Sequence, residues 1–374
     1  MLNYEFPPIG GGAGKAHLNL LRQYAEKDRL TVDVLTSGPK PGFSEENLAG
    51  NITIYKVGLH KKNLHFWRKS EVLEWLLKAR RHYRKLLRRN HYDVVHAFFA
   101  FPSGWLCYRT ANALPYIISL RGSDVPGYNV RLGLDYKLLS GLFRKIWDGA
   151  ALTVANSKGL RKLALEFMPN LDIRVISNGV DTEQFRPPQE RAPTGLLKLL
   201  TVCRLISRKR IDLLIKAVAD AKKLGHDLRL NIAGDGNLLE PLRRLADELG
   251  VAETVNFMGR VGAEQMAQVY QENDIFIMSS AHEGMSNAML EAMACGLPIV
   301  TTRCEGVEEL IADNGVVVED QGPEAIAAAI IKLAGDPHTC EKMALAARKQ
   351  AEKFSWPAVA QQYLDCYRQI VSGS

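Results

Sequence analysis

IFIMSSAHEGMSNAMLEAMACGLP, residues 275–298, is the stretch from which the fold is most readily predicted. Its first four residues are apolar, which predicts a buried strand over Ile275–Met278. Small residues then predict a turn, and Ala288–Ala294 predicts a helix that ends at Gly296-Leu297-Pro298. A strand that leads through a short turn into a helix is the first half of a βαβ unit, so this stretch indicates an α/β protein with a parallel sheet.

The turn between this strand and this helix has the chemistry of a binding site. Backbone N–H groups at a helix N-terminus bind anions, so the residues at the helix start are candidates to hold a phosphate. They are Gly284, Met285, Ser286 and Asn287. Glu283 and Glu291 carry carboxylates, which accept hydrogen bonds from vicinal hydroxyls such as those of a sugar. Taken alone, two such acids are more simply explained as a helix cap and a solvated glutamate.

A second candidate site follows an earlier strand of the same half. The sequence RLISRKR, residues 204–210, places four cations directly after the apolar run Leu197–Cys203. Two fixed cations stabilise a departing diphosphate by electrostatic preorganisation, without a metal ion. The chain has no Asp-x-Asp pair of the kind that holds a divalent ion on a sugar nucleotide, so we expect no metal site. On its own, a basic cluster is more commonly a solvated loop.

Together these motifs resemble those of glycosyltransferase family 4, whose members are retaining enzymes with the GT-B architecture. The matching motifs occur in the family's order, and each would be a weak signal alone. They are Arg204 and Lys209 at the family's Arg/Lys spacing, AGDG at residues 233–236, FMGRV at residues 257–261, and the Glu-x7-Glu pair of Glu283 and Glu291.

The resemblance implies that the C-terminal half binds a nucleotide-sugar donor, which is a substrate, so no cofactor is expected. Arg204 and Lys209 would contact the donor diphosphate, Glu283 the hydroxyls of the transferred sugar, and Glu291 the ribose. The stretch around Arg260 and Val261 would border the base. The implied donor-binding residues are Gly12, Gly14, Arg204, Lys209, Gly234, Gly236, Arg260, Val261, Glu283, Gly284, Met285, Ser286, Asn287 and Glu291. The implied catalytic residues are Glu283, Arg204, Lys209 and Arg121, and the implied acceptor-side residues are Gly11, His96 and Asp124.

In the N-terminal half, the loop PPIGGGAG at residues 7–14 resembles the family's glycine-rich loop. It follows a short first strand and precedes a helix expected from Ala16. It is not a P-loop, because Ile9 stands where the first glycine is required and Ala16 stands where Ser or Thr is required. Glycines let the backbone approach a phosphate or a sugar closely. The ordinary alternative is a tight strand-to-helix turn.

The stretches Asp93–His96 and Tyr116–Val125 also match family landmarks, with one departure. At the position of Arg121 many relatives carry a histidine thought to contact the sugar near its 6-hydroxyl or to assist proton handling. Arginine is not a base at neutral pH, which weakens an acid/base role here. Arg121 is instead suited to an acidic sugar or an acceptor phosphate. For His96, a core histidine is slightly favoured over a catalytic one.

Short β-branched runs alternate with helical patterns along the whole chain. This alternation predicts two Rossmann-like doubly wound domains, with ligands bound in a cleft at the carboxyl ends of their sheets. We expect an acceptor-side domain over residues 1–186, a proline-rich linker over 187–195 and a nucleotide-sugar-binding domain over 196–355. By resemblance, a C-terminal helix over 356–374 rejoins the first domain. The predicted strands are Leu30–Thr36, Ile52–Val57, Val94–Phe98, Tyr116–Leu120, Leu152–Ala155, Ile173–Ile176, Leu197–Cys203, Leu228–Ala233, Thr254–Met258, Ile275–Met278, Pro298–Thr302 and Gly315–Val318.

The net charge of +7 is concentrated in one segment. Residues 61–89 contain eleven Lys/Arg and two acids, a local charge of +9, and their apolar residues recur at helical spacing. Such an amphipathic helix suits peripheral contact with an anionic membrane or an anionic partner. A solvated face on a helix packed into its own domain is an equally good interpretation. No nucleic-acid-binding module surrounds the segment, so nucleic acid is not an expected partner.

The remaining features bound the compartment. The six cysteines are scattered without metal-ligand spacing, as in proteins of a reducing compartment. We expect no cleavable signal sequence, and no apolar run reaches the roughly 20 residues that a spanning helix needs. These observations predict a cytoplasmic protein, with peripheral contact at the inner face of the membrane as an extension.

The sequence therefore predicts a metal-independent, retaining hexosyltransferase that uses a nucleotide-diphosphate sugar, with UDP favoured over GDP. The expected acceptor is a hydroxyl of a glycan or of a polyprenyl-diphosphate-linked molecule, as in polysaccharide synthesis. A sugar-nucleotide epimerase or a glycan phosphorylase of the same architecture is one alternative. A non-catalytic sugar-nucleotide-binding protein is another.

Overall fold

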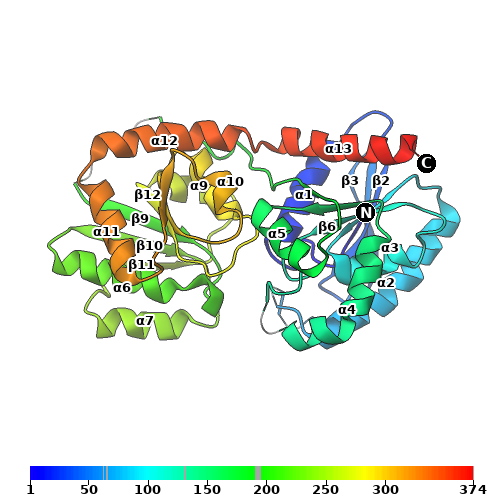
Figure 1. The fold of residues 1–374 in the computed structure, drawn as a ribbon, viewed down its shortest axis with the longest axis horizontal. Coiled ribbons are helices and arrows are strands. Elements are labelled where there is room, and N and C mark those ends of the chain that lie inside the picture. Colours follow the sequence, from blue (N-terminus) through cyan, green and yellow to red (C-terminus); the bar gives the residue numbers. More distant parts are fainter. Residues whose placement is uncertain (62, 65, 130–131, 190–194, 374) are drawn as a thin grey trace. The chain divides into compact units, whose positions relative to one another are not determined.

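The computed structural model describes residues 1–61, 63–64, 66–129, 132–189 and 195–373, and it consists of two compact units (Figure 1). The first unit comprises Met1–Asn178 and the chain from Trp356 onward, and the second comprises Gly179–Ser355. The boundary thus falls earlier than residue 186. The reason is that the N–H of Val180 donates to the carbonyl of Phe354 at 2.8 Å, and Phe185 packs edge-on against Tyr270 in the second unit. Part of the predicted linker, residues 190–194, lies outside the described residues.

The first unit contains a sheet with the strand order β3-β4-β2-β1-β5-β6-β7-β8. Neighbouring strands are parallel, except that β3 is antiparallel to β4. The strands are β1 (Leu2–Asn3), β2 (Val32–Gly38), β3 (Gly42–Ala49), β4 (Ile52–Gly58), β5 (Val95–Phe98), β6 (Tyr116–Leu120), β7 (Leu152–Ala155) and β8 (Ile173–Val175). β3 was not predicted, because most of its side chains are exposed and its sequence has no apolar alternation.

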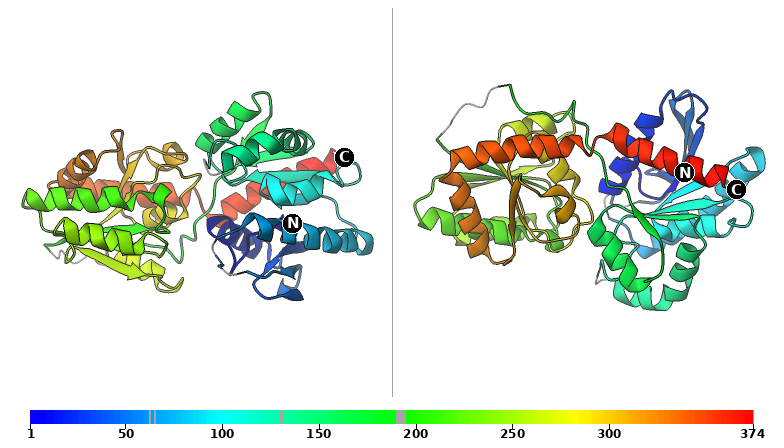
Figure 2. Two further views of the ribbon diagram at one scale, coloured as in Figure 1. Left: turned by 90° about the horizontal axis from the view of Figure 1, so that it is seen from below. Right: turned by 45° about the horizontal axis from the view of Figure 1, so that its top comes forward.

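Helices pack against the first sheet, and Figure 2 shows the C-terminal helix α13 running along this unit. α13 packs against α1, and α2 packs against α3 and the strands β2 and β4. The C-terminal helix thus lies in the first unit, as the resemblance implied. The helices are α1 (Gly12–Tyr24), α2 (Lys69–Arg89), α3 (Trp105–Tyr108), α4 (Gly133–Asp148), α5 (Lys158–Phe167) and α13 (Trp356–Ser372).

The second unit contains a fully parallel sheet with the strand order β11-β10-β9-β12-β13-β14. The strands are β9 (Leu197–Val202), β10 (Leu228–Ala233), β11 (Val255–Gly259), β12 (Ile275–Met278), β13 (Ile299–Thr302) and β14 (Gly315–Val318). The helices are α6 (Ile211–Lys223), α7 (Leu239–Glu248), α8 (Met266–Gln271), α9 (Asn287–Ala294), α10 (Val307–Leu310), α11 (Pro323–Ala334) and α12 (Pro337–Glu352). One apolar core joins the sheet to α6, α7 and α11, and another joins it to α8, α9 and α10. Because parallel strands are buried on both faces, they read in the sequence as the apolar runs that predicted them.

Candidate functional site

The order of strands in the second sheet brings the basic motif at residues 204–210 next to the acidic motif that begins at Glu283. The order reverses between β9 and β12, which are neighbours, so the loops that follow them leave the same edge of the sheet side by side. The N–H of Ala281 donates to the carbonyl of Arg208 at 2.9 Å, and the hydroxyl of Ser279 donates to the carbonyl of Arg210 at 2.7 Å. Ligands of doubly wound folds bind at such a switch point.

An ion pair joins these two loops. The ammonium of Lys209 donates to Oε2 of Glu283, and the two side chains are only 11% and 16% exposed. Arg204, at the start of the first loop, is exposed. A cation and a carboxylate that meet in a little-exposed place attract strongly, because solvent screens them less than at the surface. The structure thus brings Lys209 together with Glu283, and it places Arg204 on the same loop.

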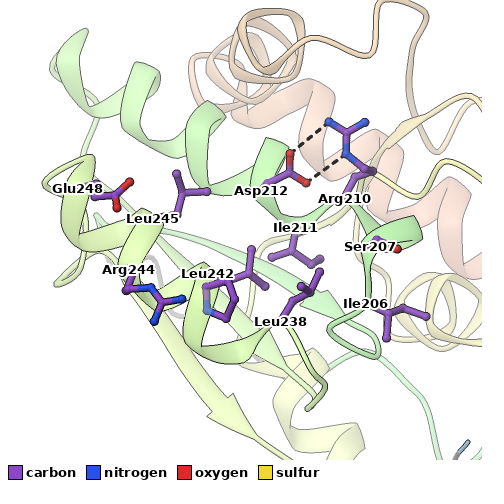
Figure 3. A pocket seen from close by; sticks show the side chains of 11 residues that line it. Ile206, Ser207, Arg210, Ile211, Asp212, Leu238, Leu242, Arg244, Leu245 and Glu248 are labelled. Atoms are coloured by element: carbon purple, nitrogen blue, oxygen red, sulfur yellow. Dashed lines mark hydrogen bonds and ion pairs between the residues drawn. The ribbon is translucent and has the colours of Figure 1, made fainter.

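The fourth cation of the basic cluster lies elsewhere. The guanidinium of Arg210 donates to both carboxylate oxygens of Asp212 at 3.1 Å, and this hydrogen bonding raises the pKa of Arg210. Figure 3 shows this pair at one end of a pocket of about 460 Å³ between the loop after β9 and α7. Leu238, Leu242 and Leu245 form its apolar side. Arg210 therefore pairs with a residue two positions away, whereas Lys209 pairs with Glu283 of the neighbouring loop.

The glycines after β10 have a packing role. Gly234 has a φ of +142°, and a Cβ built on it would overlap the carbonyl oxygen of Cys203. A Cβ on Gly236 would likewise overlap the carbonyl oxygen of Leu205. The N–H of Leu205 donates to the backbone carbonyl of Asp235 at 3.0 Å. The AGDG loop thus lies directly against the backbone that carries Arg204.

The segment predicted to border a nucleobase is one strand further along the sheet. The N–H of Gly234 donates to the carbonyl of Gly259 at 2.7 Å, which holds the end of β11 next to the AGDG loop. Arg260 follows and is exposed, whereas Val261 is partly buried against the core. The predicted donor residues of this unit therefore come from the carboxyl ends of β9, β10, β11 and β12.

The helix after β12 positions the second acid of the Glu-x7-Glu pair. α9 begins at Asn287, and the hydroxyl of its N-cap, Ser286, accepts the N–H of Met289 at 3.2 Å. In the second turn, Oε2 of Glu291 accepts the hydroxyl of Tyr270 at 2.8 Å. Burial raises the pKa of Tyr270 well above its ordinary value, so the phenol remains a donor to this carboxylate.

In the first unit, the glycine-rich loop enters α1 at Gly12, four residues before the predicted start. Gly10 has a φ of +93°, and a Cβ on it would lie 2.7 Å from the Cβ of Glu5. A Cβ on Gly14 would lie 3.1 Å from the carbonyl oxygen of Glu5, whereas one on Gly11 would meet nothing within 4 Å. The helix begins earlier because glycines allow its first turn to approach the backbone of Glu5, and sequence propensity does not register such an approach.

Both nitrogens of the His96 ring are engaged inside the first unit. Nδ1 lies 2.7 Å from the hydroxyl of Tyr367, and Nε2 lies 2.7 Å from that of Ser119. The side chain is buried, and this burial, with the positive charge of Arg121, lowers its pKa well below 6.5. The geometry is that of a satisfied core histidine, which the sequence slightly favoured.

Asp124 and Arg121 form one turn after β6. The carboxylate of Asp124 accepts the backbone N–H groups of Ala100, Arg121 and Gly122 at 2.7, 2.8 and 3.0 Å. Asp124 is buried and bonded to backbone. The guanidinium of Arg121 donates to Oδ1 of Asn178 at 2.8 Å and lies 4.3 Å from the ring centre of Phe98.

Comparison with known proteins places these sites in context. The family model described as Glycosyltransferase Family 4 matches residues 10–184, and the model described as Glycosyl transferases group 1 matches residues 182–350. Together they match nearly the whole chain. The chain belongs to glycosyltransferase family 4. It is therefore a glycosyltransferase, and its two Rossmann-like units are those of the GT-B fold.

Individual family 4 relatives and similar structures agree with this assignment. A GDP-mannose-dependent alpha-(1-6)-phosphatidylinositol monomannoside mannosyltransferase of Mycolicibacterium smegmatis is 34% identical over 57% of this chain and 61% of its own. An uncharacterized glycosyltransferase of Methanocaldococcus jannaschii is 26% identical over 98% of this chain and 97% of its own. A sucrose-phosphate synthase structure from Thermosynechococcus elongatus superposes with a TM-score of 0.84, at 21% identity, over 97% of this chain and 94% of that one.

One carboxylate of this family 4 chain was not identified from the sequence. Oε2 of Glu305 accepts the backbone N–H of Glu283 at 3.0 Å, and Oε1 lies 3.0 Å from Nδ1 of His282. Glu305 follows β13 in a stretch without periodicity. Only the strand order, which sets β13 beside β12, could have drawn attention to it.

Two further properties concern the residues that the structure describes. No helix among them is long and apolar enough to cross a membrane. No group of three or more His, Cys, Asp or Glu side chains among them could hold a metal ion.

Proposed function

We propose that this glycosyltransferase transfers a hexose from a nucleotide-diphosphate sugar with retention of the anomeric configuration and without a metal ion. The observation that carries the proposal is the meeting of Lys209 and Glu283 at the switch point of the second sheet. There, Lys209 and Arg204 would receive the departing diphosphate, and Glu283 would accept hydroxyls of the sugar. Glu291, oriented by Tyr270, would hold the ribose.

The chemistry requires no separate protein base. The bond between the sugar C1 and the diphosphate oxygen breaks, and the acceptor oxygen forms a bond to C1 on the same face. The acceptor proton passes to an oxygen of the departing diphosphate, whose negative charge is stabilised by Arg204 and Lys209. Consistent with this route, Arg121 is not a base at neutral pH, and both ring nitrogens of His96 are engaged.

The donor base is proposed as uridine, with guanosine as the second candidate. The M. smegmatis relative is named as GDP-mannose-dependent, and this name is the specific observation that favours guanosine. Either base would lie beside Arg260 and Val261 at the end of β11.

The acceptor is proposed to be a hydroxyl of an anionic glycan or of a lipid-linked molecule such as a polyprenyl diphosphate. Arg121 is a fixed cation, since Asn178 and the ring of Phe98 hold its guanidinium in one orientation. Such a planar, oriented group suits a carboxylate or a phosphate better than a neutral sugar.

Peripheral contact with an anionic membrane is proposed for α2. One surface of this helix gathers Arg80, Arg81, Arg84, Lys85 and Arg88 beside the exposed side chain of Leu77. A second helix, α4, is tied to α2 by the ion pair of Lys69 and Asp135, and it exposes Leu134 and Leu138. Exposed leucines next to dense positive charge are the composition of interfacial helices.

The first experiment is a thermal-shift panel of UDP, GDP, ADP and their common sugar conjugates, on wild type and Glu291→Ala, with EDTA present throughout. The proposal expects a large shift from one nucleotide family that is lost in the variant. No shift from any of them would remove support for the donor site. Product analysis by NMR then separates the alternatives, because a transferase yields a glycoside with the donor's anomeric configuration, an epimerase yields an isomeric donor, and a binding protein leaves the donor intact.

The membrane contact has its own test. Charge reversal of Arg84, Lys85, Arg88 and Arg89 to Glu should abolish sedimentation with liposomes that contain anionic lipid. The matched control reverses four exposed cations on other helices, which are Arg161, Lys162, Lys342 and Lys349. Equal binding by both variants would contradict a specific role for α2.

A further inference from the structure

The loop after β13 supplies a side chain that binds the backbone of residues 279–286, the loop between β12 and α9, which we call the donor loop. The two carboxylate oxygens of Glu305 have different partners, which are the N–H of Glu283 and Nδ1 of His282, each at 3.0 Å. Neighbouring residues of the donor loop thus share one carboxylate. The carboxylate contacts the peptide of Glu283 and not its side chain, so the charged end of Glu283 remains available to Lys209.

The position of this carboxylate is fixed by the backbone next to it. Gly306 has a φ of +83°, and a Cβ built on it would overlap the carbonyl oxygen of Gly284. The backbone segments at Gly306 and Gly284 therefore lie so close together that only glycine fits at position 306. The side chain of Glu305 is 18% exposed, whereas that of His282 is 44% exposed. Glu305 is thus confined, whereas His282 is more open to solvent.

The donor loop is attached on its other side as well. The N–H of Ala281 donates to the carbonyl of Arg208 at 2.9 Å, and the side chain of Glu283 pairs with Lys209. These contacts pull the loop toward β9, and Glu305 holds it toward β13. Without Glu305, the peptide N–H of Glu283 would lose its acceptor. The bond from the hydroxyl of Thr302 to the carbonyl of Ser280, at 3.4 Å, would still join the loop to β13, but nothing in it orients Glu283.

We propose that Glu305 is a positioning residue, which orients Glu283 for the sugar of the donor through the peptide of Glu283, with His282 as its second partner. This inference rests on the proposed function. The two partners of Glu305 lie at residues 282 and 283, whereas Glu291, which would bind the ribose, accepts the hydroxyl of Tyr270 one helix away. The effect of Glu305 should therefore fall on the sugar and not on the nucleotide.

The test compares Glu305→Ala and Glu305→Gln with wild type, using nucleotide-sugar kinetics and the affinity for the free nucleoside diphosphate. Loss of a hydrogen bond to a charged acceptor predicts that Glu305→Ala lowers kcat/KM by about ten- to a hundredfold. The dissociation constant of the free nucleotide should change less than about twofold, because uniform binding is retained. Glutamine keeps an acceptor oxygen for the N–H of Glu283, so Glu305→Gln should recover most of the activity.

The matched control is Glu308→Ala, which removes the same charge three residues away. Glu308 is 69% exposed and pairs with Arg303 at 3.5 Å, so this variant should behave as wild type. If Glu305→Ala does not fold, Glu305→Gln and His282→Ala carry the test, with a smaller loss of kcat/KM expected from the latter and unchanged nucleotide affinity.

Three outcomes would overturn the inference alone while the donor site stands. They are wild-type activity in Glu305→Ala, an equal loss of free-nucleotide affinity, and a Glu305→Gln variant as impaired as Glu305→Ala. A wild-type protein that binds no nucleotide would instead overturn the proposed function, and the inference with it.

Discussion

The ammonium of Lys209 and the carboxylate of Glu283 form an ion pair, although 74 residues separate them in the chain. The two residues belong to different motifs, and the strand order makes them neighbours. Both side chains are largely buried, so solvent screens their attraction little. A donor diphosphate that binds Lys209 therefore competes with Glu283, and a sugar hydroxyl that binds Glu283 competes with Lys209.

Replacement of Lys209 by alanine should lower kcat by about a hundred- to a thousandfold, because a preorganised cation at the leaving group is lost. Glu283→Gln should also lower kcat, but it keeps a neutral acceptor for Lys209. Steady-state kinetics with the donor identified by the thermal-shift panel check both effects.

The control for Lys209 is its neighbour Arg210. Arg210 pairs with Asp212 beside the pocket between the loop after β9 and α7, so Arg210→Asn should change kcat less than about threefold. Asparagine is chosen because Arg210 has a φ of 48°, a conformation that asparagine tolerates. Equal losses in the two variants would show that the whole cluster acts only as a diffuse positive field.

Glu291→Ala should raise KM for the donor about tenfold or more, with a smaller change in kcat, because the ribose does not change during the reaction. Tyr270→Phe removes only the hydroxyl that orients Glu291 at 2.8 Å, so it should raise KM by a few fold. Steady-state kinetics measure KM, and calorimetric titration with the free nucleotide measures the matching loss of affinity. A Tyr270→Phe variant that lowers kcat and leaves nucleotide affinity unchanged would contradict this assignment.

Much of the fold could be predicted because parallel strands are buried on both faces. The strands Tyr116–Leu120, Leu228–Ala233 and Ile275–Met278 were predicted to the residue from their apolar runs. β3 was missed because its first six side chains are exposed. The early start of α1 was missed because glycines lower helix propensity, and the close approach to Glu5 that requires them is a tertiary feature.

The candidate site was predictable in its motifs but not in its connections. The resemblance assigned Lys209 and Glu283 to one donor site, but no pattern in the sequence predicts the ion pair between their side chains. Glu305 belongs to no sequence motif, because its contacts depend on the pairing of β12 with β13 and on the adjacent Gly306. The hydrogen bond at Nδ1 of His96 depends on Tyr367 of α13, which follows His96 by 271 residues. Such long-range partners are set by topology, which local sequence does not encode.

Acid should destabilise the first unit. Burial lowers the pKa of His17 and His96 well below 6.5, so the folded unit excludes protons that the unfolded chain binds. The folded first unit has its full stability with respect to these two histidines above pH 6.5, and it loses stability as the pH falls below that value. The unfolding free energy should fall by up to about 1.4 kcal/mol per pH unit for each histidine, until the folded pKa is reached.

Tryptophan fluorescence measures this effect on the first unit alone, because all five tryptophans lie in it. Urea unfolding should be compared between pH 7 and pH 5.5. In His17→Gln, glutamine can keep the bond to Asn3, and the slope with pH should fall by the share of one histidine. His338→Gln, an exposed change in the second unit, is the control. An unchanged slope in His17→Gln would contradict the assignment.

Arg121→Lys should lower kcat/KM for an anionic acceptor about tenfold, although it keeps the charge. Lysine has no planar fork and cannot hold Asn178 while it stacks on Phe98. The affinity for the free nucleotide should be unchanged, since Arg121 belongs to the first unit and the donor residues of the motif belong to the second. A variant equally active on anionic and neutral acceptors would contradict selection of an anion by Arg121.

The glycine-rich loop offers a change that separates folding from function. Gly11 has no neighbour within 4 Å of a built Cβ and no positive φ, but its ψ of −136° lies outside the regions that alanine prefers. Gly11→Ala should therefore lower the stability of the first unit less than Gly10→Ala does. Gly10→Ala should lower the stability by about 1–3 kcal/mol, because alanine is strained at a φ of +93° and its Cβ would meet Glu5 at 2.7 Å.

Activity then shows whether a ligand approaches this loop. If the acceptor or the donor lies against the backbone at Gly11, the added methyl group fills that space, and kcat/KM should fall at least tenfold in a normally folded Gly11→Ala protein. The paired stability measurement is necessary, because a loss of activity in Gly10→Ala has a structural cause. Full activity in Gly11→Ala would assign the loop to the ordinary strand-to-helix turn, and the acceptor would then have to bind through Arg121 and its surroundings.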